Sequence, residues 1–583
     1  METAQKIYSR LFAGMGLVAL LLLNLFSYAQ PKNLKLYQVD PLEKVLKERN
    51  YFLDRPDTMR AAAGETISIQ IVVKANKEVQ QLDASLGTIS NGKEILTGHT
   101  GWLGYVKVGR RYNEPSKDLI NSVSGYFPDP ILTDTTMQLE TGEVQPLWIT
   151  VPVPVEAKPG IYTGSVRISG RFNKKKESFL KDFVIQVYPV KVPKTSLLVS
   201  NWSSHESPMS LAHLNKGIRV EYYTPLYWEL IKIQADIMAS HGQNVFYTFP
   251  VWRTHYTLKD GKYTFDFSNY DKEVEIFEST GALERIEGAH LAIRGGAWEG
   301  PFYVTIPVEA SEENIVNANA LSLDGINKDL RMVNLPLSDS RTKNFLDQFL
   351  PAFKKHLEGK GWLNKYMQHI GDEPLPSNAD SYLEISDYVR KYLPGVKIMD
   401  AVLTSKELRE NGIDTWIPVL DIMHTDYKFY QDLQKKGKEI WFYTCLRPRG
   451  NYANRFIELP LLQTRYLHWI NFKYNIPGYL HWGLNFWGAT DPLTEELTRD
   501  NSNLPAGDNN IIYPGYHKIY SSIRFEAMRD GIYDNELLRM LDKKNKAKAW
   551  EFVNTIIHDF DKYDGSISYF RKIRKNLLEE LSK

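Results

Sequence analysis

The sequence predicts a multidomain protein of the β + α/β class, in which an N-terminal antiparallel β-sandwich precedes a (β/α)8 barrel of the TIM type. Its 583 residues exceed what a single hydrophobic core organises. Short segments that alternate apolar and polar residues fill the first part of the chain, as in an antiparallel sandwich. After about residue 193, strand-like and helix-like segments follow one another in turn, which favours parallel strands joined by helices.

Residues 1–29 are typical of a secretory signal peptide. Lys6 and Arg10 precede an apolar run over 11–26, and Ser27 and Ala29 supply small residues at positions −3 and −1 of a cleavage site. The run is short for a membrane span. We therefore expect a mature chain that starts near Gln30, keeps no transmembrane segment and is secreted, in a bacterium to the periplasm.

Composition narrows the class of partner. Lys and Arg number 71 against 70 Asp and Glu, so the chain lacks the basic excess that nucleic acid binding requires, and no nucleic acid partner is expected. The 13 Trp, 34 Tyr and 25 Phe suit a protein that stacks against flat ligands such as sugar rings, although most must be ordinary core residues. The single cysteine, Cys445, excludes intrachain disulfides and multi-cysteine metal sites.

The predicted sandwich covers residues 30–192 and the predicted catalytic barrel covers residues 193–583. Sandwich strands are expected at 65–73, 147–153, 160–168 and 182–188, with a Pro-rich linker at 187–194. Barrel strands are expected at 196–203, 244–250, 285–293, 365–371, 397–402, 416–422, 439–445 and 478–485. Helices are expected at 223–241, 341–356, 379–392, 427–435, 461–474, 516–541, 544–560 and 568–581. The segment 267–344 has no clear periodicity and is expected to form long loops.

The most informative segment is 366–374, which reads Tyr-Met-Gln-His-Ile-Gly-Asp-Glu-Pro. It predicts a strand that ends at a Gly turn and presents Asp372 and Glu373 side by side, with Pro374 preventing a regular continuation. Paired carboxylates are the usual acid and base groups for cleaving glycosidic bonds. The alternative is a solvated loop that happens to carry two charges.

Other chemically useful side chains follow the predicted strands, at the barrel end where active sites lie. Aromatic rings would stack on a sugar face, and polar groups would bind its hydroxyls; each could instead be a packed core residue. The candidate substrate-binding residues are Trp298, His369, Asp400, Tyr443, Trp482, Asn485 and Trp487. Asp421 and His424 could suggest a metal, but the sequence offers no matching third ligand. No metal or cofactor is therefore predicted.

The chain resembles glycoside hydrolase family 123, the β-N-acetylgalactosaminidases. The residues that carry the resemblance are 369–374 (His-Ile-Gly-Asp-Glu-Pro), 482–487 (Trp-Gly-Leu-Asn-Phe-Trp) and the stretch 523–534. The resemblance implies a β-sandwich ahead of a (β/α)8 catalytic domain, and retaining, substrate-assisted hydrolysis of terminal β-linked N-acetylgalactosamine from glycans of the glycosphingolipid type. It implies Glu373 as the general acid/base. It also implies that Asp372 orients the substrate's 2-acetamido group, which attacks the anomeric carbon.

The adjacency of the two carboxyls fits that chemistry. A double-displacement enzyme places its carboxyls about 5–5.5 Å apart on opposite faces of the bond, which is awkward for consecutive residues but unnecessary when the substrate supplies the nucleophile. We expect a raised pKa for Glu373 and an ionised Asp372. The alternatives are a β-N-acetylglucosaminidase, another retaining glycosidase, or a non-catalytic glycan-binding barrel.

Overall fold

The computed structural model describes residues 33–54, 57–109, 119–120, 124–204, 208–311, 329–403, 408, 412–489, 491–495 and 504–583. The predicted signal peptide lies outside these residues. None of the described helices combines the length and the apolar character that a membrane crossing requires.

The N-terminal part consists of two sheets packed face to face. The strands of the first sheet, in order, are β1 (Leu34–Val39), β3 (Thr66–Ala75), β10 (Val144–Pro152), β7 (His99–Val108) and β8 (Gly125–Leu132). Those of the second are β2 (Met59–Ala63), β12 (Lys175–Lys191), β11 (Gly160–Phe172), β4 (Val79–Leu86) and β9 (Met137–Leu139), with β5 (Ile89–Ser90) and β6 (Ile95–Leu96) at its side. All pairs are antiparallel except β2 with β12.

The alternation that predicted this part sorts its side chains between the core and solvent. Along β11, buried positions alternate with exposed or half-buried ones from Tyr162 to Phe172. Ile69, Trp102 and Leu147 of the first sheet join Ile168 and Ile185 of the second in one apolar core. The prediction of N-terminal antiparallel sheets is confirmed.

Parallel strands follow in two sheets. One has the order β13 (Leu198–Asn201), β26 (Gly478–His481), β25 (Phe442–Thr444). The other has the order β14 (Val245–Thr248), β17 (Arg285–Gly288), β21 (Tyr366–Gln368), β22 (Lys397–Val402), β23 (Thr415–Pro418), β24 (Glu439–Ile440). Every pair in both is parallel. Within the described residues, a parallel strand lies at each place where the sequence predicts a barrel strand.

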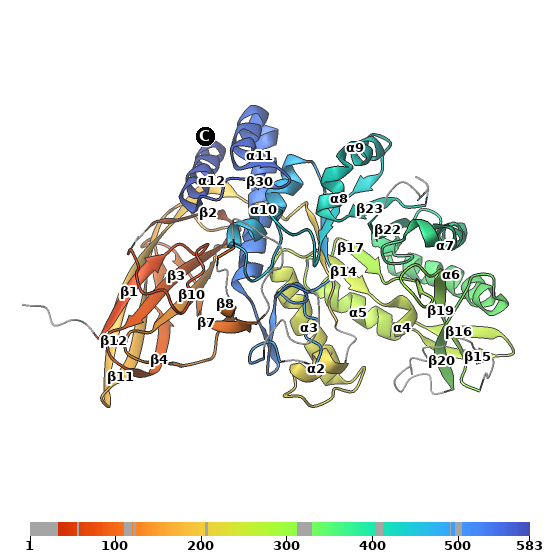
Figure 1. Cartoon of the computed structure of the whole chain (residues 1–583), viewed down its shortest axis with the longest axis horizontal. Coiled ribbons are helices and arrows are strands. Elements are labelled where there is room, and N and C mark those ends of the chain that lie inside the picture. Colours follow the sequence, from red (N-terminus) through yellow and green to blue (C-terminus); the bar gives the residue numbers. More distant parts are fainter. Residues whose placement is uncertain are drawn as a thin grey trace, which may run out of the picture.

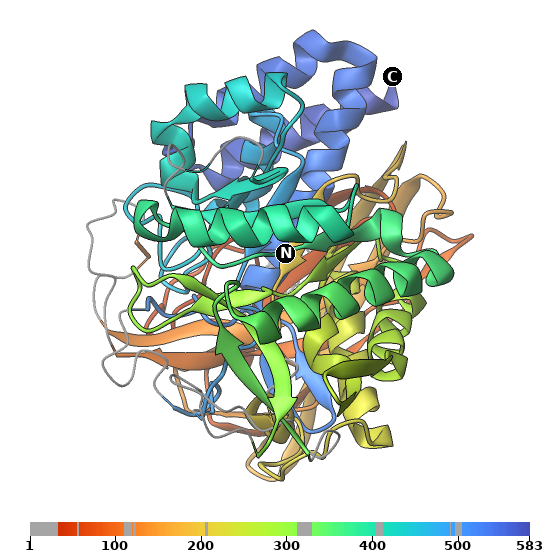
Figure 2. The same ribbon diagram turned by 90° about the vertical axis from the view of Figure 1, so that its right-hand side faces the viewer.

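Helices alternate with these strands along the chain and follow the last of them. They are α2 (Pro208–His213), α3 (Pro225–Ser240), α4 (Pro250–Arg253), α5 (Ser268–Ser279), α6 (Ser340–Lys360), α7 (Ala379–Tyr392), α8 (Leu420–Thr425), α9 (Tyr427–Lys435), α10 (Leu461–Lys473), α11 (Ile523–Ile556) and α12 (Ile567–Ser582). In Figure 1 the sandwich lies at the left, and helices α4 to α9 lie at the right. Turning the molecule brings α6 and α7 across the front, side by side (Figure 2).

Three of the predicted elements were wrong. The helix expected from residue 516 begins only at Ile523, where Ser522 caps it, and a hairpin of β27 (Tyr513–Gly515) and β28 (Lys518–Tyr520) precedes it. The helix expected to reach residue 560 ends at Ile556. The chain then forms the hairpin of β29 (Ile557–Asp559) and β30 (Lys562–Tyr563). Besides the predicted strand at β17, the segment 267–344 contains regular structure that periodicity missed: α5 and the antiparallel sheet β18 (Ala292–Arg294), β19 (Phe302–Glu309) and β20 (Leu330–Leu335). A further hairpin, β15 (His255–Lys259) with β16 (Lys262–Asp266), lies just before it.

Buried charge joins the sandwich to the C-terminal helices. Asp129 of β8 accepts hydrogen bonds from Arg524 of α11 at 2.7 and 3.0 Å and from Tyr513 at 2.6 Å, and both ionic side chains are fully buried. The other Arg524 nitrogen donates to the carbonyls of Arg455 and Gly507, both at 2.8 Å. A single guanidinium thus ties the sandwich to two loops beyond the parallel strands.

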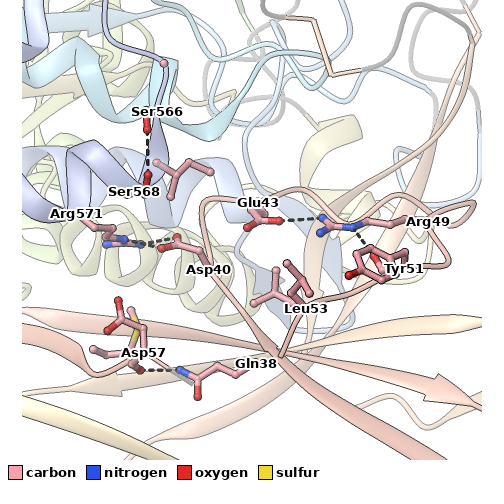
Figure 3. Close-up of a pocket in the computed structure, with 14 residues that line it drawn as sticks. Gln38, Asp40, Glu43, Arg49, Tyr51, Leu53, Asp57, Ser566, Ser568 and Arg571 are labelled. Atoms are coloured by element: carbon pink, nitrogen blue, oxygen red, sulfur yellow. Dashed lines mark hydrogen bonds and ion pairs between the residues drawn. The ribbon is translucent and has the colours of Figure 1, made fainter. Parts of the chain in front are cut away.

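A cleft of about 780 Å³ opens at the same junction. It lies between residues 38–59 of the sandwich and the start of α12, and its ion pairs are Asp40 with Arg571 and Glu43 with Arg49 (Figure 3). Its lining residues do not come from the ends of the parallel strands. It is therefore separate from the predicted active site.

The Asp129–Arg524 pair yields a stability prediction. We expect D129A to destabilise the protein by about 3–5 kcal/mol, because it leaves the Arg524 guanidinium buried without its counter-ion. The measurement is the shift in the midpoint of urea unfolding. The control is D134A, which removes a half-exposed ion pair with Lys518 across the same interface and should cost about 1 kcal/mol or less. Equal shifts for the two variants would refute the assignment.

Candidate active site

The Asp-Glu turn begins directly after β21. Gly371 packs against the ring of Phe302, and a Cβ atom at this position would lie 2.5 Å from that ring, so the close approach accounts for the glycine. The left-handed residue of the turn is Glu373, with φ of 44°, rather than Gly371. Arg294, at the end of β18, donates a hydrogen bond to the Glu373 carbonyl at 2.6 Å. The surrounding structure therefore imposes an unfavourable backbone conformation on Glu373.

The two carboxyls stand in different surroundings. Burial raises the pKa of Glu373, although the hydrogen bond from Tyr443 of β25 and the charges of Arg294 and Arg447 oppose the rise. Burial and the neighbouring Glu373 raise the pKa of Asp372 to about 7, against the charge of Arg294. The predicted direction for Glu373 agrees with this. The raised pKa of Asp372 runs against the expected ionised form, which stays a prediction.

A buried carboxylate–imidazole–carboxylate cluster lies beneath the turn. His369 Nδ1 lies 2.7 Å from Asp400 Oδ1 on β22, and His369 Nε2 lies 2.7 Å from Glu287 Oε1 on β17. All three side chains are fully buried. Burial alone lowers the pKa of an imidazole, but the hydrogen bonds and charges of Asp400 and Glu287 raise the pKa of His369 to about 10. His369 is therefore an imidazolium that bridges two carboxylates.

The same cluster positions groups at the site. Asp400 Oδ2 accepts from the backbone N–H of Ile370 at 3.0 Å and from Tyr382 Oη at 2.5 Å, which anchors the chain two residues before Asp372. Glu287 Oε1 accepts from the indole N–H of Trp202 at 2.7 Å. The cluster therefore fixes both the segment that leads to the Asp-Glu turn and one aromatic ring.

An aromatic wall adjoins this cluster. Trp202 stacks on Tyr247 with ring centroids 4.9 Å apart, and its edge contacts His290 at 5.3 Å. His290 Nδ1 lies 3.2 Å from Tyr247 Oη, and its Nε2 lies 3.7 Å from Asp400 Oδ1. His290, His369 and Asp400 have the residue types of a metal site. Both nitrogens of His369 are nevertheless hydrogen-bonded to carboxylates, so it has no nitrogen left for a metal.

The remaining predicted residues divide into two groups. Trp298 is 46% exposed, and the Arg294 guanidinium stacks over its ring at 3.6 Å, which places it beside the Asp-Glu turn. Trp482 packs in one apolar cluster with Tyr443 and Cys445, and its indole N–H donates to Asp508 at 3.2 Å. These two rings are at least partly accessible beside the turn.

Asn485 and Trp487 are buried instead. The Asn485 side chain accepts from the Ser204 N–H at 2.8 Å and donates to Gln234 at 2.7 Å, and the Trp487 indole N–H donates to the Ile512 carbonyl at 2.9 Å. These contacts are within the protein, and a role in substrate binding stays a prediction for both residues.

Sequence reasoning missed Glu287, Arg294, Tyr382 and Asp508. Burial raises the pKa of Asp508 to about 7, although Arg455 and Trp482 oppose the rise. A usable signal existed for Glu287, which is a lone acid inside the short strand Arg285–Gly288. The sequence signal for Arg294 was weaker: it is a cation directly before the Gly295-Gly296 pair.

The buried imidazolium gives a pH prediction. The pKa of His369 in the folded protein exceeds the value of about 6.5 expected after unfolding, so its stabilising effect is complete below pH 6.5 and is lost as pH rises towards 10. We expect the free energy of unfolding of the wild type to fall more steeply than that of H369Q between pH 7 and 10, by about 1.4 kcal/mol per unit. Urea unfolding at several pH values measures this. H558Q, at an exposed histidine, is the control, and identical slopes for wild type and H369Q would contradict the prediction.

Comparison with solved structures supports the fold. A family 123 glycoside hydrolase from Clostridium perfringens, from a study of glycolipid glycan hydrolysis, superimposes with a TM-score of 0.68 at 17% identity, covering 94% of this chain and 97% of that one. A β-glucuronidase from Parabacteroides merdae (TM-score 0.29, 9% identity, 79% and 53% covered) and a family 20 exo-β-N-acetylglucosaminidase from Vibrio harveyi (0.29, 8%, 89% and 99%) are too distant to support any argument. A search of curated proteins finds no match.

Family models identify both parts of the chain. The model for the glycoside hydrolase 123 N-terminal domain matches residues 47–170, and the model for the glycoside hydrolase 123 catalytic domain matches residues 206–541, which is more than half of the chain. The second match contains the Asp-Glu turn, the His369 cluster and Tyr443. The chain belongs to glycoside hydrolase family 123, and it is a glycosidase.

Proposed function

We propose that this protein is a secreted, retaining exo-β-N-acetylgalactosaminidase that works by substrate-assisted catalysis. The observation that carries the proposal is the adjacency of Asp372 and Glu373 on one half-buried turn, with a raised pKa at both carboxyls. Neighbouring residues are poorly placed to act from opposite faces of a glycosidic bond. They suit a reaction in which the 2-acetamido group of the substrate is the nucleophile.

The two parallel sheets support one closed (β/α)8 barrel. Parallel strands of both sheets and Trp441 contribute to one apolar cluster that is distinct from the core under the helices; its members include Leu198, Val245, Met367, Met399, Ile417 and Leu480. The Asn244 N–H, just before β14, donates to the Val199 carbonyl of β13 at 3.3 Å, and a parallel bridge joins Val419 to Tyr443. These contacts connect the edges of the two sheets, and in a barrel closed in this way the Asp-Glu turn would lie at the carboxyl end of the strands.

The proposed reaction has two steps. In the first, Glu373 donates its proton to the glycosidic oxygen while the acetamido carbonyl oxygen bonds to the anomeric carbon, which releases the aglycone and leaves an oxazolinium ion. In the second, the Glu373 carboxylate takes a proton from water, whose oxygen attacks the anomeric carbon and reopens the ring. Two inversions at the anomeric carbon give net retention.

Asp372 and Tyr443 have different parts in this scheme. Asp372 accepts a hydrogen bond from the acetamido N–H and, as a carboxylate, balances the positive charge of the oxazolinium ion. With a pKa of about 7, it ionises readily once that charge develops. The Tyr443 hydroxyl donates to Glu373 Oε1 and holds the acid in place.

Exposed aromatic surface supports binding of a sugar. Trp298 presents its ring beside the turn while Arg294 covers one of its faces. A pyranose can stack on such a ring. The glycan terminates in β-linked N-acetylgalactosamine in this proposal, and a glycolipid is a suitable source, as it is for the relative from Clostridium perfringens. Export to the periplasm, directed by residues 1–29, would bring the enzyme to such a glycan.

A substrate panel tests the proposal directly. Nitrophenyl β-N-acetylgalactosaminide, β-N-acetylglucosaminide and β-galactoside separate the galacto requirement from the acetamido requirement, and a thiazoline mimic of the oxazolinium ion reports the mechanism. Cleavage of the first substrate alone, inhibited by the thiazoline, is expected. Cleavage of the β-N-acetylglucosaminide instead would favour the gluco alternative, and binding without turnover would favour a glycan-binding protein.

Variants of the two carboxyls should behave differently. We expect E373Q to lose about 10²–10⁴-fold in kcat/KM on a substrate with a poor leaving group, less on a dinitrophenyl glycoside, and to regain turnover with azide. D372N should lose activity on both substrates without azide rescue, because it affects the acetamido nucleophile. D380N, at an exposed carboxyl in the first turn of α7, is the matched control. Equal behaviour of E373Q and D372N across leaving groups would refute the division of roles.

Arg294 sets the pH range in this scheme. Its positive charge lowers the pKa of both carboxyls, so R294Q should raise both pKa values and move both limbs of the kcat/KM profile to higher pH. The pH dependence of nitrophenyl glycoside hydrolysis measures the shift. R294K retains the charge and should keep the limbs near their wild-type positions. Limbs that stay in place in R294Q would show that Arg294 does not control this titration.

A further inference from the structure

His424, for which the sequence shows no complete set of metal ligands, lies near two aspartates in the folded chain. Asp421 is occupied elsewhere, because Arg447 donates to it at 2.6 Å. His424, on the same short helix α8, faces Asp559 and Asp561 of the β29–β30 hairpin instead. One ligand atom from each of these three residues lies within 4.8 Å of the other two.

The orientation of the His424 ring leaves one nitrogen directed at the acids. His424 Nδ1 lies 2.8 Å from Tyr452 Oη, and the ring stacks on Phe560 with centroids 5.1 Å apart. Its Nε2 lies 3.6 Å from Asp559 Oδ1, which is longer than a hydrogen bond. A histidine that binds a metal through one nitrogen characteristically uses the other in a hydrogen bond that fixes the ring. The Tyr452 hydroxyl provides that bond here.

Asp561 supplies an independent observation. Its Oδ1 is shielded from solvent and has no hydrogen-bond partner in the part of the chain that the structure describes. Leaving a shielded carboxylate oxygen unsatisfied is costly. A cation between Asp561, Asp559 and His424 would remove that cost.

The local charge also favours a cation. Asp559 and Asp561 bring two negative charges, and the Lys562 ammonium, 3.7 Å from Asp559 Oδ2 and largely exposed, offsets only one. Asp559 Oδ1 accepts from the Phe560 N–H at 2.9 Å and from Tyr474 Oη at 3.2 Å, which holds the carboxylate in position. His424 and Asp559 are both partly exposed, so an ion can reach them from solvent.

We propose that His424, Asp559 and Asp561 form a binding site for a divalent transition metal, with Zn²⁺ as the expected ion. One imidazole and two carboxylates are ligands that Zn²⁺ accepts, with bonds of about 2.0–2.2 Å and water completing the shell. Such bonds place ligands about 3–4 Å apart, so small side-chain shifts close the set. The metal would link α8, and the loop that carries Tyr452, to the β29–β30 hairpin. The proposal does not depend on the substrate.

Metal titration of the untagged, chelator-treated mature chain tests the site. We expect one equivalent of Zn²⁺ to bind in calorimetry and to raise the thermal unfolding temperature, and Co²⁺ to give a visible absorption spectrum at the same stoichiometry. D561N and H424Q should weaken Zn²⁺ binding at least tenfold, and Y452F roughly tenfold through the lost orienting bond. H558Q removes the neighbouring exposed histidine of the same hairpin, and D432N removes an exposed carboxylate; both should bind Zn²⁺ as the wild type does.

Two other outcomes would contradict the proposed metal site. A wild type that binds neither Zn²⁺ nor Co²⁺ would show that the cluster is only a His–Asp ion pair. Binding that D561N and H424Q leave unchanged would place the ion elsewhere. The far-UV circular dichroism spectra of the variants, matched to that of the wild type, separate loss of the site from loss of the fold.

Discussion

The geometry at the Asp-Glu turn depends on the buried imidazolium of His369. It links β17, β21 and β22 through its bonds to Glu287 and Asp400, and those carboxylates hold the Trp202 indole and the Ile370 N–H. Two buried carboxyls at this place need a charged or hydrogen-bonding partner, and His369 provides one to both. The position of Asp372 and Glu373 therefore depends on a charge balance one layer below them.

Buried charged side chains also connect the sandwich to the parallel strands. Arg524 joins Asp129 of the sandwich to the carbonyls of Arg455 and Gly507, and Arg455 in turn donates to the Asn201 side chain at 2.9 Å and to the Gly483 carbonyl. Asn201 ends β13, and Gly483 follows Trp482. Two guanidinium groups thereby connect the sandwich to the ends of two parallel strands. The sandwich therefore acts on the site by holding these strand ends in place and not by direct contact.

Much of the fold was predictable from the sequence because strand and helix periodicities are local. The ends of α7 and α9 match the predicted ranges, and β22 does too. Partnerships were not predictable: nothing in the sequence indicates that Glu287 meets His369, or that Asp561 meets His424, because these pairs form only when distant segments fold together. The contacts of Asn485 were not predictable either, because its side chain bonds to Ser204 and Gln234, which are distant in the sequence.

The charge balance also bears on the two carboxyls of the turn. In the part of the chain that the structure describes, His369 contacts Glu287 and Asp400, Arg294 contacts the turn, and Arg447 is paired with Asp421. Burial raises the pKa of both Asp372 and Glu373, which favours a proton on the turn. The two carboxyls differ in their partners. Glu373, whose backbone is left-handed, accepts a hydrogen bond from Tyr443, whereas the charges of Arg294, Asp400 and His369 act on the pKa of Asp372. In the proposed mechanism, one turn would therefore offer a proton donor and a counter-ion from consecutive residues.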